Sequence, residues 1–164
     1  MPRARQALGF GGPPAGAVVD GGVLPRHPFD PDAPSVSASV PLLIGTTRDE
    51  MTFFTYPDER LDTLDDAGAI AAVLPLAGER AQHLYSVYSQ TRPDATPTQR
   101  LAAMLTDRFR VGSIRMAERK AALGEAPVWM YRFDFASDVE DGALGAPHAM
   151  DVAFTFGNTQ TQPR

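Results

Sequence analysis

The sequence predicts an α/β domain in which a mostly parallel sheet is flanked by helices, and three observations carry this prediction. One continuous apolar run, "VPLLIGTT" at 40–47, reaches a glycine, and a second apolar run, "APVWMYRFDF" at 126–135, is rich in branched and aromatic residues. Such runs are typical of parallel strands that are buried on both faces. Between them lies a long segment with helical apolar spacing. A helix between two parallel strands implies a right-handed crossover.

A proline-rich loop precedes the first strand, and two helices are expected after it. The segment 21–34 has prolines too frequent for a helix or a central strand, because each proline removes a backbone donor and fixes φ. Two helices that should cover the sheet are expected at about 65–74 and 76–90, interrupted by Pro75. One face of the second helix should carry three apolar side chains: Leu84, Val87 and Tyr88.

The best-marked helix begins after Thr96, which can cap it. Pro97 suits the first helical position, and Gln99 completes a capping box with the threonine. The helix is expected to run to Leu123, because Gly124 is a suitable terminating residue. Its apolar positions have a helical spacing: Leu101, Met104, Leu105, Phe109, Ile114 and Ala117.

The composition limits the classes of function open to the chain. Its 164 residues suffice for one domain with a core. The net charge is −5 and the basic residues are scattered, which argues against a nucleic-acid partner. Cysteine is absent, so thiol catalysis and cysteine metal sites are excluded. No apolar run has the length of a signal peptide or a membrane span, and nothing in the sequence indicates a location in the cell.

Ionisable residues follow the two predicted strands. The segment "GTTRDE" offers Asp49 and Glu50, and "GAPHAMD" offers His148, on a loop before an aromatic, strand-like run. Functional side chains of parallel sheets lie beyond the carboxyl ends of the strands. A carboxylate that accepts the Nδ1 proton of an imidazole fixes its tautomer and stabilises the imidazolium. Glu50 and His148 could therefore form the acid–base half of a hydrolytic triad.

Simpler interpretations of these residues remain open. A single histidine on a loop is usually solvated, and acidic residues after a strand commonly cap the next helix. His27 and His83 are interpreted as a loop residue and a helix-surface residue without chemistry. A metal site formed by His148, Asp151 and His27 lacks a histidine pair at i, i+4 spacing, so no metal or other cofactor is expected.

Five segments between about Val18 and Asn158 carry a resemblance to a known family: "VVDGGVLPRHPFDP", "VPLLIGTTRDEMTFF", "MLTDRF", "APVWMYRFDF" and "GAPHAMDVAFTFGN". In this order they resemble the type-B carboxylesterases, the family similar to cholinesterases and bacterial para-nitrobenzyl esterases. The resemblance implies an α/β-hydrolase fold, a small carboxylic ester as substrate, and a serine–glutamate–histidine triad. Within that triad it implies Glu50 as the acid and His148 as the base.

Two positions depart from the family pattern. Met51 stands where the family usually has a glycine after the acid, and Asp151 stands where it usually has a glutamate three residues after the histidine. The shorter Asp151 would reach less far in a supporting role, and Asp49 is interpreted as structural. Met51, Phe53 and Phe54 are expected in the core rather than in an acyl pocket.

No serine of this chain fits the nucleophile of such a triad. A nucleophile elbow needs G-x-S-x-G on a strand-to-helix turn. Among the seven serines, the nearest candidate is Ser113, but Val111 and Arg115 replace the glycines and the residue lies in the predicted long helix. Because the serine precedes the acid and the histidine in α/β-hydrolases, we expect it upstream of Met1. The resemblance thus implies that 1–164 is a carboxyl-terminal segment of a hydrolase domain, incomplete at both ends.

Three functions remain open for such a segment. It could supply the acid and base of an ester hydrolase, serve as a non-catalytic cholinesterase-like interaction module, or be an inactive truncated gene product. As a hydrolase segment it should place Glu50 and His148 within hydrogen-bond distance and expose apolar surface.

Overall fold

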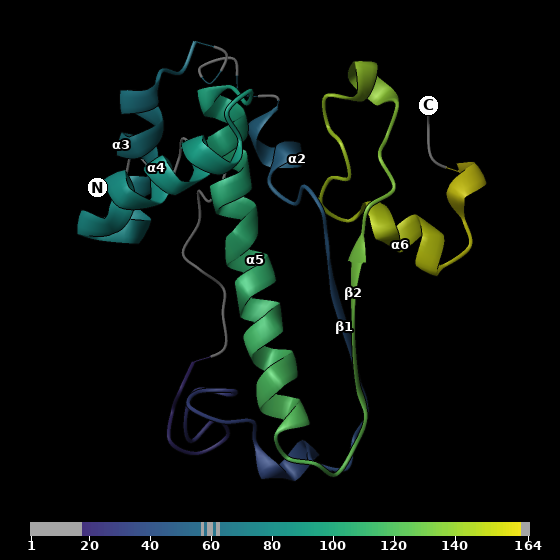
Figure 1. Ribbon diagram of the computed structural model, residues 1–164. Coiled ribbons are helices and arrows are strands. Elements are labelled where there is room, and N and C mark those ends of the chain that lie inside the picture. The colour runs from purple at the N-terminus through teal and green to yellow at the C-terminus, as the bar shows by residue number, and fades with distance from the viewer. Residues whose placement is uncertain (1–17, 57, 59–60, 62, 162–164) are drawn as a thin grey trace.

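The computed structural model describes residues 18–56, 58, 61 and 63–161 (Figure 1). Its elements in chain order are η1 (Ser35–Ser37), β1 (Leu42–Thr47), α2 (Thr52–Thr55), α3 (Asp66–Ala77), η3 (Gly78–Arg80), α4 (Ala81–Thr91), α5 (Pro97–Ala121), β2 (Val128–Phe133), η4 (Val139–Gly142), α6 (Met150–Thr155) and η5 (Thr159–Thr161). The long helix α5 runs beside β1 and β2, and the shorter helices α3 and α4 lie at its amino-terminal end (Figure 1).

The two strands pair in parallel, as the sequence predicts. Their register runs from Leu42 opposite Val128 to Thr47 opposite Phe133, so the carboxyl ends of both strands lie at one edge of the sheet. The connection between the strands contains α2 to α5. Both strands are shorter than predicted, since β1 begins at Leu42 rather than at residue 40, and β2 covers only Val128–Phe133 of the run 126–135.

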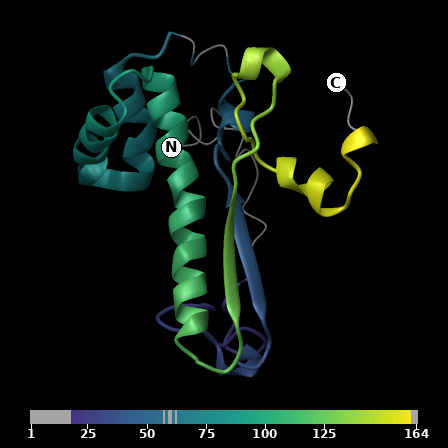
Figure 2. The same cartoon turned by 45° about the vertical axis from the view of Figure 1, so that its right-hand side comes forward.

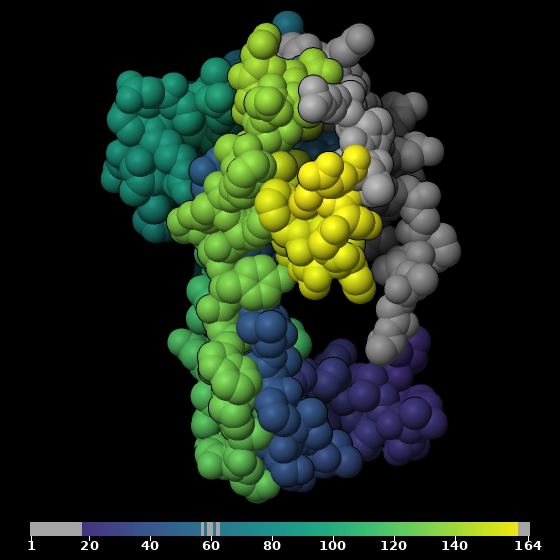
Figure 3. Space-filling model, turned by 90° about the vertical axis from the view of Figure 1, so that its right-hand side faces the viewer, coloured from purple at the N-terminus to yellow at the C-terminus, as the bar shows by residue number. Residues whose placement is uncertain are grey.

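The prediction that both faces of the strands are buried is wrong for the described part of the chain. Leu43 is 68% exposed and Trp129, its partner in the register, is 54% exposed. The helix α5 covers one face of the sheet, whereas α6 lies only near the carboxyl end of the other face (Figure 2). In the space-filling view of that side, β1 and β2 form much of the visible surface below α6 (Figure 3). An apolar strand sequence predicts burial, but the elements that would bury this face are not among the described residues.

The main core lies between the helices rather than under the sheet. It joins Met51 after β1 to the facing sides of α3, α4 and the first half of α5. Its buried members are Met51, Leu61, Ala69, Val73, Ala81, Tyr85, Leu101, Met104 and Leu105. The predicted apolar face of α4 is therefore wrong in part, since Leu84 and Val87 are exposed. The buried side of α4 is set by its contacts with α3 and α5, and these helices do not cover the sheet as expected.

The helix break expected at Pro75 occurs three residues later. The helix α3 continues through Pro75 to Ala77 and ends at Gly78, which has φ 55° and ψ −138°. Pro75 lies in the last turn of α3, and the Gly78 N–H after it still bonds the Leu74 carbonyl. Glycine, which tolerates positive φ, is the residue that ends the helix.

The amino terminus of α5 forms the predicted capping box. The Thr96 hydroxyl accepts from the Gln99 N–H at 3.2 Å, and the Gln99 side chain accepts from the Thr96 N–H at 2.9 Å. The helix ends at Ala121, two residues before the predicted Leu123, and Gly124 follows with φ 70°.

The second half of α5 is less buried than its spacing predicts. Phe109 and Ile114 are exposed, because α3 and α4 pack against the first half only. Near its carboxyl end the buried Lys120 donates to the carbonyls of Ser37 and Ala38. This contact anchors the segment before β1, in which 21–34 forms turns and bends without helix or strand, as predicted.

Three tyrosine–carboxylate pairs predict a loss of stability in alkali. Burial and then a hydrogen bond to Asp107 raise the pKa of Tyr88, and Tyr85 and Tyr131 also have raised pKa values. The folded chain holds these phenol protons more tightly than the unfolded chain does. The contribution of the pairs to the free energy of unfolding is therefore complete below about pH 10, the phenol pKa in the unfolded chain, and is lost as the pH rises. We expect the free energy of unfolding, measured with urea, to fall above that pH. The Tyr88→Phe variant should lose stability less steeply there, and an identical pH slope would contradict this explanation.

Candidate active site

The structure brings Glu50 and His148 together at the carboxyl edge of the sheet. Glu50 lies in the turn between β1 and α2, and His148 lies in the turn that leads into α6. The imidazole Nδ1 is 2.6 Å from the Glu50 carboxylate Oε2, although the residues are 98 positions apart in the sequence. The two residues that were predicted to pair are therefore within hydrogen-bond distance.

Both oxygens of the Glu50 carboxylate are engaged. The residue is 6% exposed, and its Oε1 accepts from the backbone N–H of Thr47 at 2.7 Å while its Oε2 faces the imidazole. An ionised carboxylate only accepts, so in this geometry Nδ1 carries the proton. The other ring nitrogen, Nε2, is then the acceptor of a neutral imidazole. The His148 side chain is 45% exposed, so the ring remains reachable from outside this chain.

Two phenylalanine rings contact the imidazole. Phe54 in α2 and Phe109 in α5 have ring centroids 5.4 Å and 6.1 Å from that of His148, at angles of 45° and 43°. Helical spacing is the only sequence signal at Phe109, and it does not indicate a contact with the histidine. A small hollow of about 240 Å³ beside it is lined by Met51, Leu105, Arg108 and Phe109. The pair is therefore bordered by apolar side chains on the helical side.

Of the three residues after Glu50 that were expected in the core, two are in or against it and one is exposed. Met51 is buried in the helical core, and Phe54 packs against that core. Phe53 is 55% exposed, so its placement in the core was wrong. Its ring meets that of Phe54 edge-on at a centroid distance of 5.3 Å, and Phe54 is the ring that contacts His148.

Asp49 holds the loop before His148 by hydrogen bonds, which agrees with the interpretation of this residue as structural. Its Oδ2 accepts from the Ala146 N–H at 2.9 Å and from the Arg48 Nε at 2.8 Å. Its own backbone N–H donates to the Ala146 carbonyl at 3.0 Å. Gly145 has φ 61°, and a Cβ there would fall 2.2 Å from Asp49 Oδ2. The loop therefore needs glycine at position 145 to pass so close to Asp49.

The Gly145→Ala variant is expected to destabilise this loop more than Gly142→Ala. Both glycines have positive φ, so each alanine costs about 1–2 kcal/mol in backbone strain. Only the Cβ at position 145 also meets the Asp49 carboxylate, since nothing lies closer than 3.8 Å to a Cβ at 142. Urea unfolding of both variants checks this difference, and equal losses would show that the contact with Asp49 is unimportant.

The residues after His148 form a helix and not the strand-like run that was expected. Ala149 has φ 64°, which turns the chain into α6, and the rings of Phe133, Phe135 and Phe154 pack together at centroid distances of 5.0–6.4 Å. The aromatic residues thus attach a short helix to the end of β2. Asp151, in the first turn of α6, accepts from the Tyr131 hydroxyl at 2.8 Å.

The other candidate residues lie away from this pair or lack the required setting. His27 is exposed in the loop before η1, and His83 is exposed on α4. Ser113 lies within α5 and not on a strand-to-helix turn. Among the described residues, no group of three or more acidic or histidine side chains could hold a metal ion. None of the helices in that part of the chain is long and apolar enough to cross a membrane.

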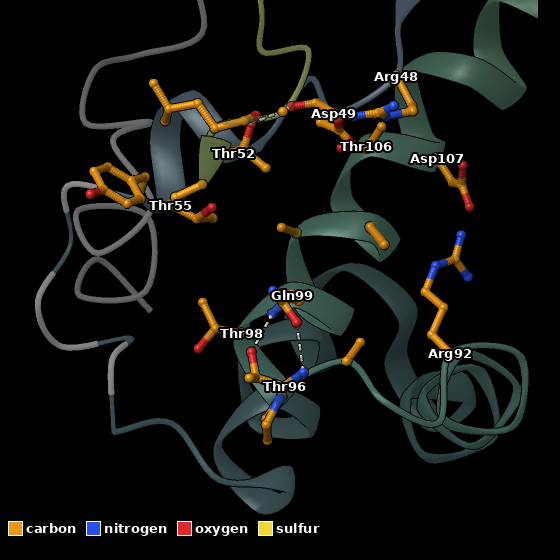
Figure 4. Close-up of a pocket in the computed structure, with 18 of the residues that line it drawn as sticks. Arg48, Asp49, Thr52, Thr55, Arg92, Thr96, Thr98, Gln99, Thr106 and Asp107 are labelled. Atoms are coloured by element: carbon orange, nitrogen blue, oxygen red, sulfur yellow. Dashed lines mark hydrogen bonds and ion pairs between the residues drawn. The ribbon is translucent and has the colours of Figure 1, made fainter. Parts of the chain in front are cut away.

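A larger open cavity lies beside Asp49 and does not include the Glu50–His148 pair. It measures about 860 Å³ and is lined by Arg48, Asp49, Thr52, Thr106 and Asp107 together with the first turn of α5 (Figure 4). Neither Glu50 nor His148 lines this cavity. Arginine and aspartate side chains are among those that line it, including Arg48, Asp49, Arg92 and Asp107 (Figure 4).

The sequence profile of the carboxylesterase family matches residues 8–164. The chain belongs to the carboxylesterase family. Family membership implies an α/β-hydrolase fold, and the helices with two parallel strands are consistent with part of such a fold. It also agrees with the five segments whose order resembles the type-B carboxylesterases.

Two characterised carboxylesterase relatives are similar over most of this chain. The chain is 32% identical over 143 residues to the phenmedipham hydrolase of Pseudarthrobacter oxydans, an alignment that covers 86% of this chain and 27% of the relative. It is 36% identical over 145 residues to the para-nitrobenzyl esterase of Bacillus subtilis (strain 168). This alignment covers 85% of this chain and 27% of that relative. The chain therefore spans about a quarter of the length of these relatives.

Proposed function

We propose that this chain is the carboxyl-terminal part of an α/β-hydrolase that cleaves small carboxylic esters, with Glu50 as acid and His148 as base of a Ser–Glu–His triad. The observation that carries the proposal is the 2.6 Å contact between Nδ1 and Oε2 at the carboxyl edge of the parallel strands. Membership in the carboxylesterase family supports the reaction class.

In the proposed reaction, the imidazole first accepts a proton and then donates it. His148 Nε2 takes the proton of a serine hydroxyl as its oxygen attacks the ester carbonyl, and the imidazolium then gives this proton to the departing alkoxide. A water molecule repeats these steps on the acyl-enzyme and releases the carboxylic acid. Glu50 keeps the proton on Nδ1 and stabilises the imidazolium. Its backbone hydrogen bond from Thr47 holds the carboxylate in place for this purpose.

The nucleophile is proposed to come from a part of the protein on the amino-terminal side of this chain. None of the seven serines here lies in G-x-S-x-G. The relatives are nearly four times as long as the aligned segment, which leaves room for such an elbow. The exposed face around Leu43 and Trp129, and a sheet that has two strands within the described residues, fit a sheet that continues with further strands and helices.

The purified 164-residue chain is expected to show no burst of product and no saturable turnover with a chromogenic short-chain ester. The reason is that His148 has no elbow serine to activate within this chain. Stopped-flow measurement of the released chromophore checks this. A burst stoichiometric with the chain that disappears in His148→Ala would place the nucleophile inside these residues and overturn the proposal.

A second candidate is a non-catalytic interaction module, which the lack of an elbow serine and the exposed apolar side chains of the sheet favour. The two functions differ in one residue of the complete protein. A serine in the upstream G-x-S-x-G favours the hydrolase, whereas another residue at that position favours the interaction module. Sequencing of the coding region upstream distinguishes the two.

A further inference from the structure

Tyr131 on β2 lies unusually close to the backbone of β1. It is opposite Gly45 in the strand register, and a Cβ on this glycine would fall 2.3 Å from carbons of the tyrosine ring. Only glycine leaves space for a ring at this distance. The ring therefore lies over β1 at Gly45, which precedes Glu50 by five residues in the chain.

The hydroxyl of Tyr131 connects the sheet to the helix that follows His148. It donates to Asp151 Oδ2 at 2.8 Å, and Asp151 lies three residues after the histidine in the first turn of α6. The hydrogen bond to Asp151 is the first cause of the raised pKa of Tyr131, followed by burial and by the negative charges of Asp151 and Glu50. The phenol is thus within electrostatic reach of both carboxylates.

On the carboxyl side of His148, α6 contacts β2 and the residues after it through the Tyr131–Asp151 hydrogen bond and through the packing of Phe154 against Phe133 and Phe135. The left-handed Ala149 directly follows the histidine, and α6 has six residues, which is too short to be stable without tertiary contacts. The ring contact of Phe154 with Phe133 attaches the far end of α6 to β2. Rotation of α6 about this apolar contact would move the imidazole relative to Glu50.

We infer that Tyr131 and Asp151 form a positioning pair that keeps the His148 imidazole oriented so that its Nδ1 faces the Glu50 carboxylate. The inference rests on the proposed function of the Glu50–His148 pair. The pair touches neither substrate nor nucleophile in this assignment; it acts by fixing the orientation of α6 against the sheet.

The tautomer of His148 tests the inference directly. Long-range ¹H–¹⁵N spectra of the 164-residue chain, recorded where the imidazole is neutral, report whether Nδ1 or Nε2 carries the proton. We expect the Nδ1–H form in the unaltered chain. Tyr131→Phe keeps the ring on Gly45 but removes the donor, and Asp151→Ala removes the acceptor, so both should lose most of the Nδ1–H population. Asp151→Asn retains an acceptor oxygen and should restore it.

A matched control separates positioning from a general loss of stability. Tyr85→Phe removes a hydroxyl bonded to Asp66 at 2.5 Å, in the helical core on the other side of α5, and should leave the His148 tautomer unchanged. If His148 is Nδ1–H in the unaltered chain and remains so in Tyr131→Phe, the positioning pair is refuted while the proposed function stands. If His148 is Nε2–H in the unaltered chain, the contact with Glu50 is absent and both fail.

Discussion

In the complete polypeptide that carries the elbow serine, His148→Ala is expected to lower kcat for a chromogenic ester on the order of 10⁴- to 10⁶-fold. Triad members act as a unit, so losing the base forfeits most of the rate that the serine provides. KM should change far less, because the imidazole acts mainly in the transition state. Steady-state kinetics of the purified variant gives both constants.

Two other histidines provide the control for this experiment. His27 and His83 are exposed and lie outside the Glu50–His148 contact. His27→Ala and His83→Ala should retain the kcat of the parent within a few-fold, which shows that the loss belongs to one position and not to histidine content. A large loss in either control would mean that the base has been assigned to the wrong residue.

Glu50→Gln is expected to lower kcat on the order of 10⁴-fold, the second largest effect. The amide has nearly the same size, and its oxygen can still accept from the Thr47 N–H. Its NH₂ group would then face Nδ1 of His148, which must accept instead of donate, and the ring is held in the wrong tautomer. The imidazolium also loses the negative charge that stabilises it. Kinetics over a range of substrate concentrations should show this loss in kcat.

Asp49→Asn is the matched control for the acid. Asparagine keeps an oxygen that accepts from the Ala146 N–H, so the hydrogen bond to the loop is largely preserved. We expect kcat within about tenfold of the parent, since the change reaches the imidazole only through the loop. If Asp49→Asn loses activity and Glu50→Gln retains it, the acid is Asp49.

Much of the architecture follows from local patterns in the sequence. The capping box at Thr96 and Gln99 needs only a few neighbouring residues, and it was predicted correctly. The break at Gly78 instead of Pro75 follows from the position of the proline in the last turn and from the positive φ of the glycine, whereas the buried side of α4 depends on where the neighbouring helices pack. The exposure of Leu43 and Trp129 depends on elements that are not among the described residues, so no periodicity in the strands could predict it.

The candidate site was likewise predictable only in part. Glu50 and His148 could be selected because each follows a predicted strand and because the segments resemble the type-B carboxylesterases. The contact of Tyr131 with Asp151 could not, since it depends on the register of β1 and β2 and on the left-handed turn at Ala149. Contacts between distant segments become visible only when the register is known.

Rescue of the His148→Ala variant by added imidazole tests the central claim most directly. In the complete polypeptide, imidazole in solution should occupy the space of the missing ring beside Glu50 and restore part of kcat in a saturable manner, with no such effect on Glu50→Gln, which keeps its own ring. If His148→Ala retains a kcat comparable to that of the parent without added imidazole, His148 is not the base.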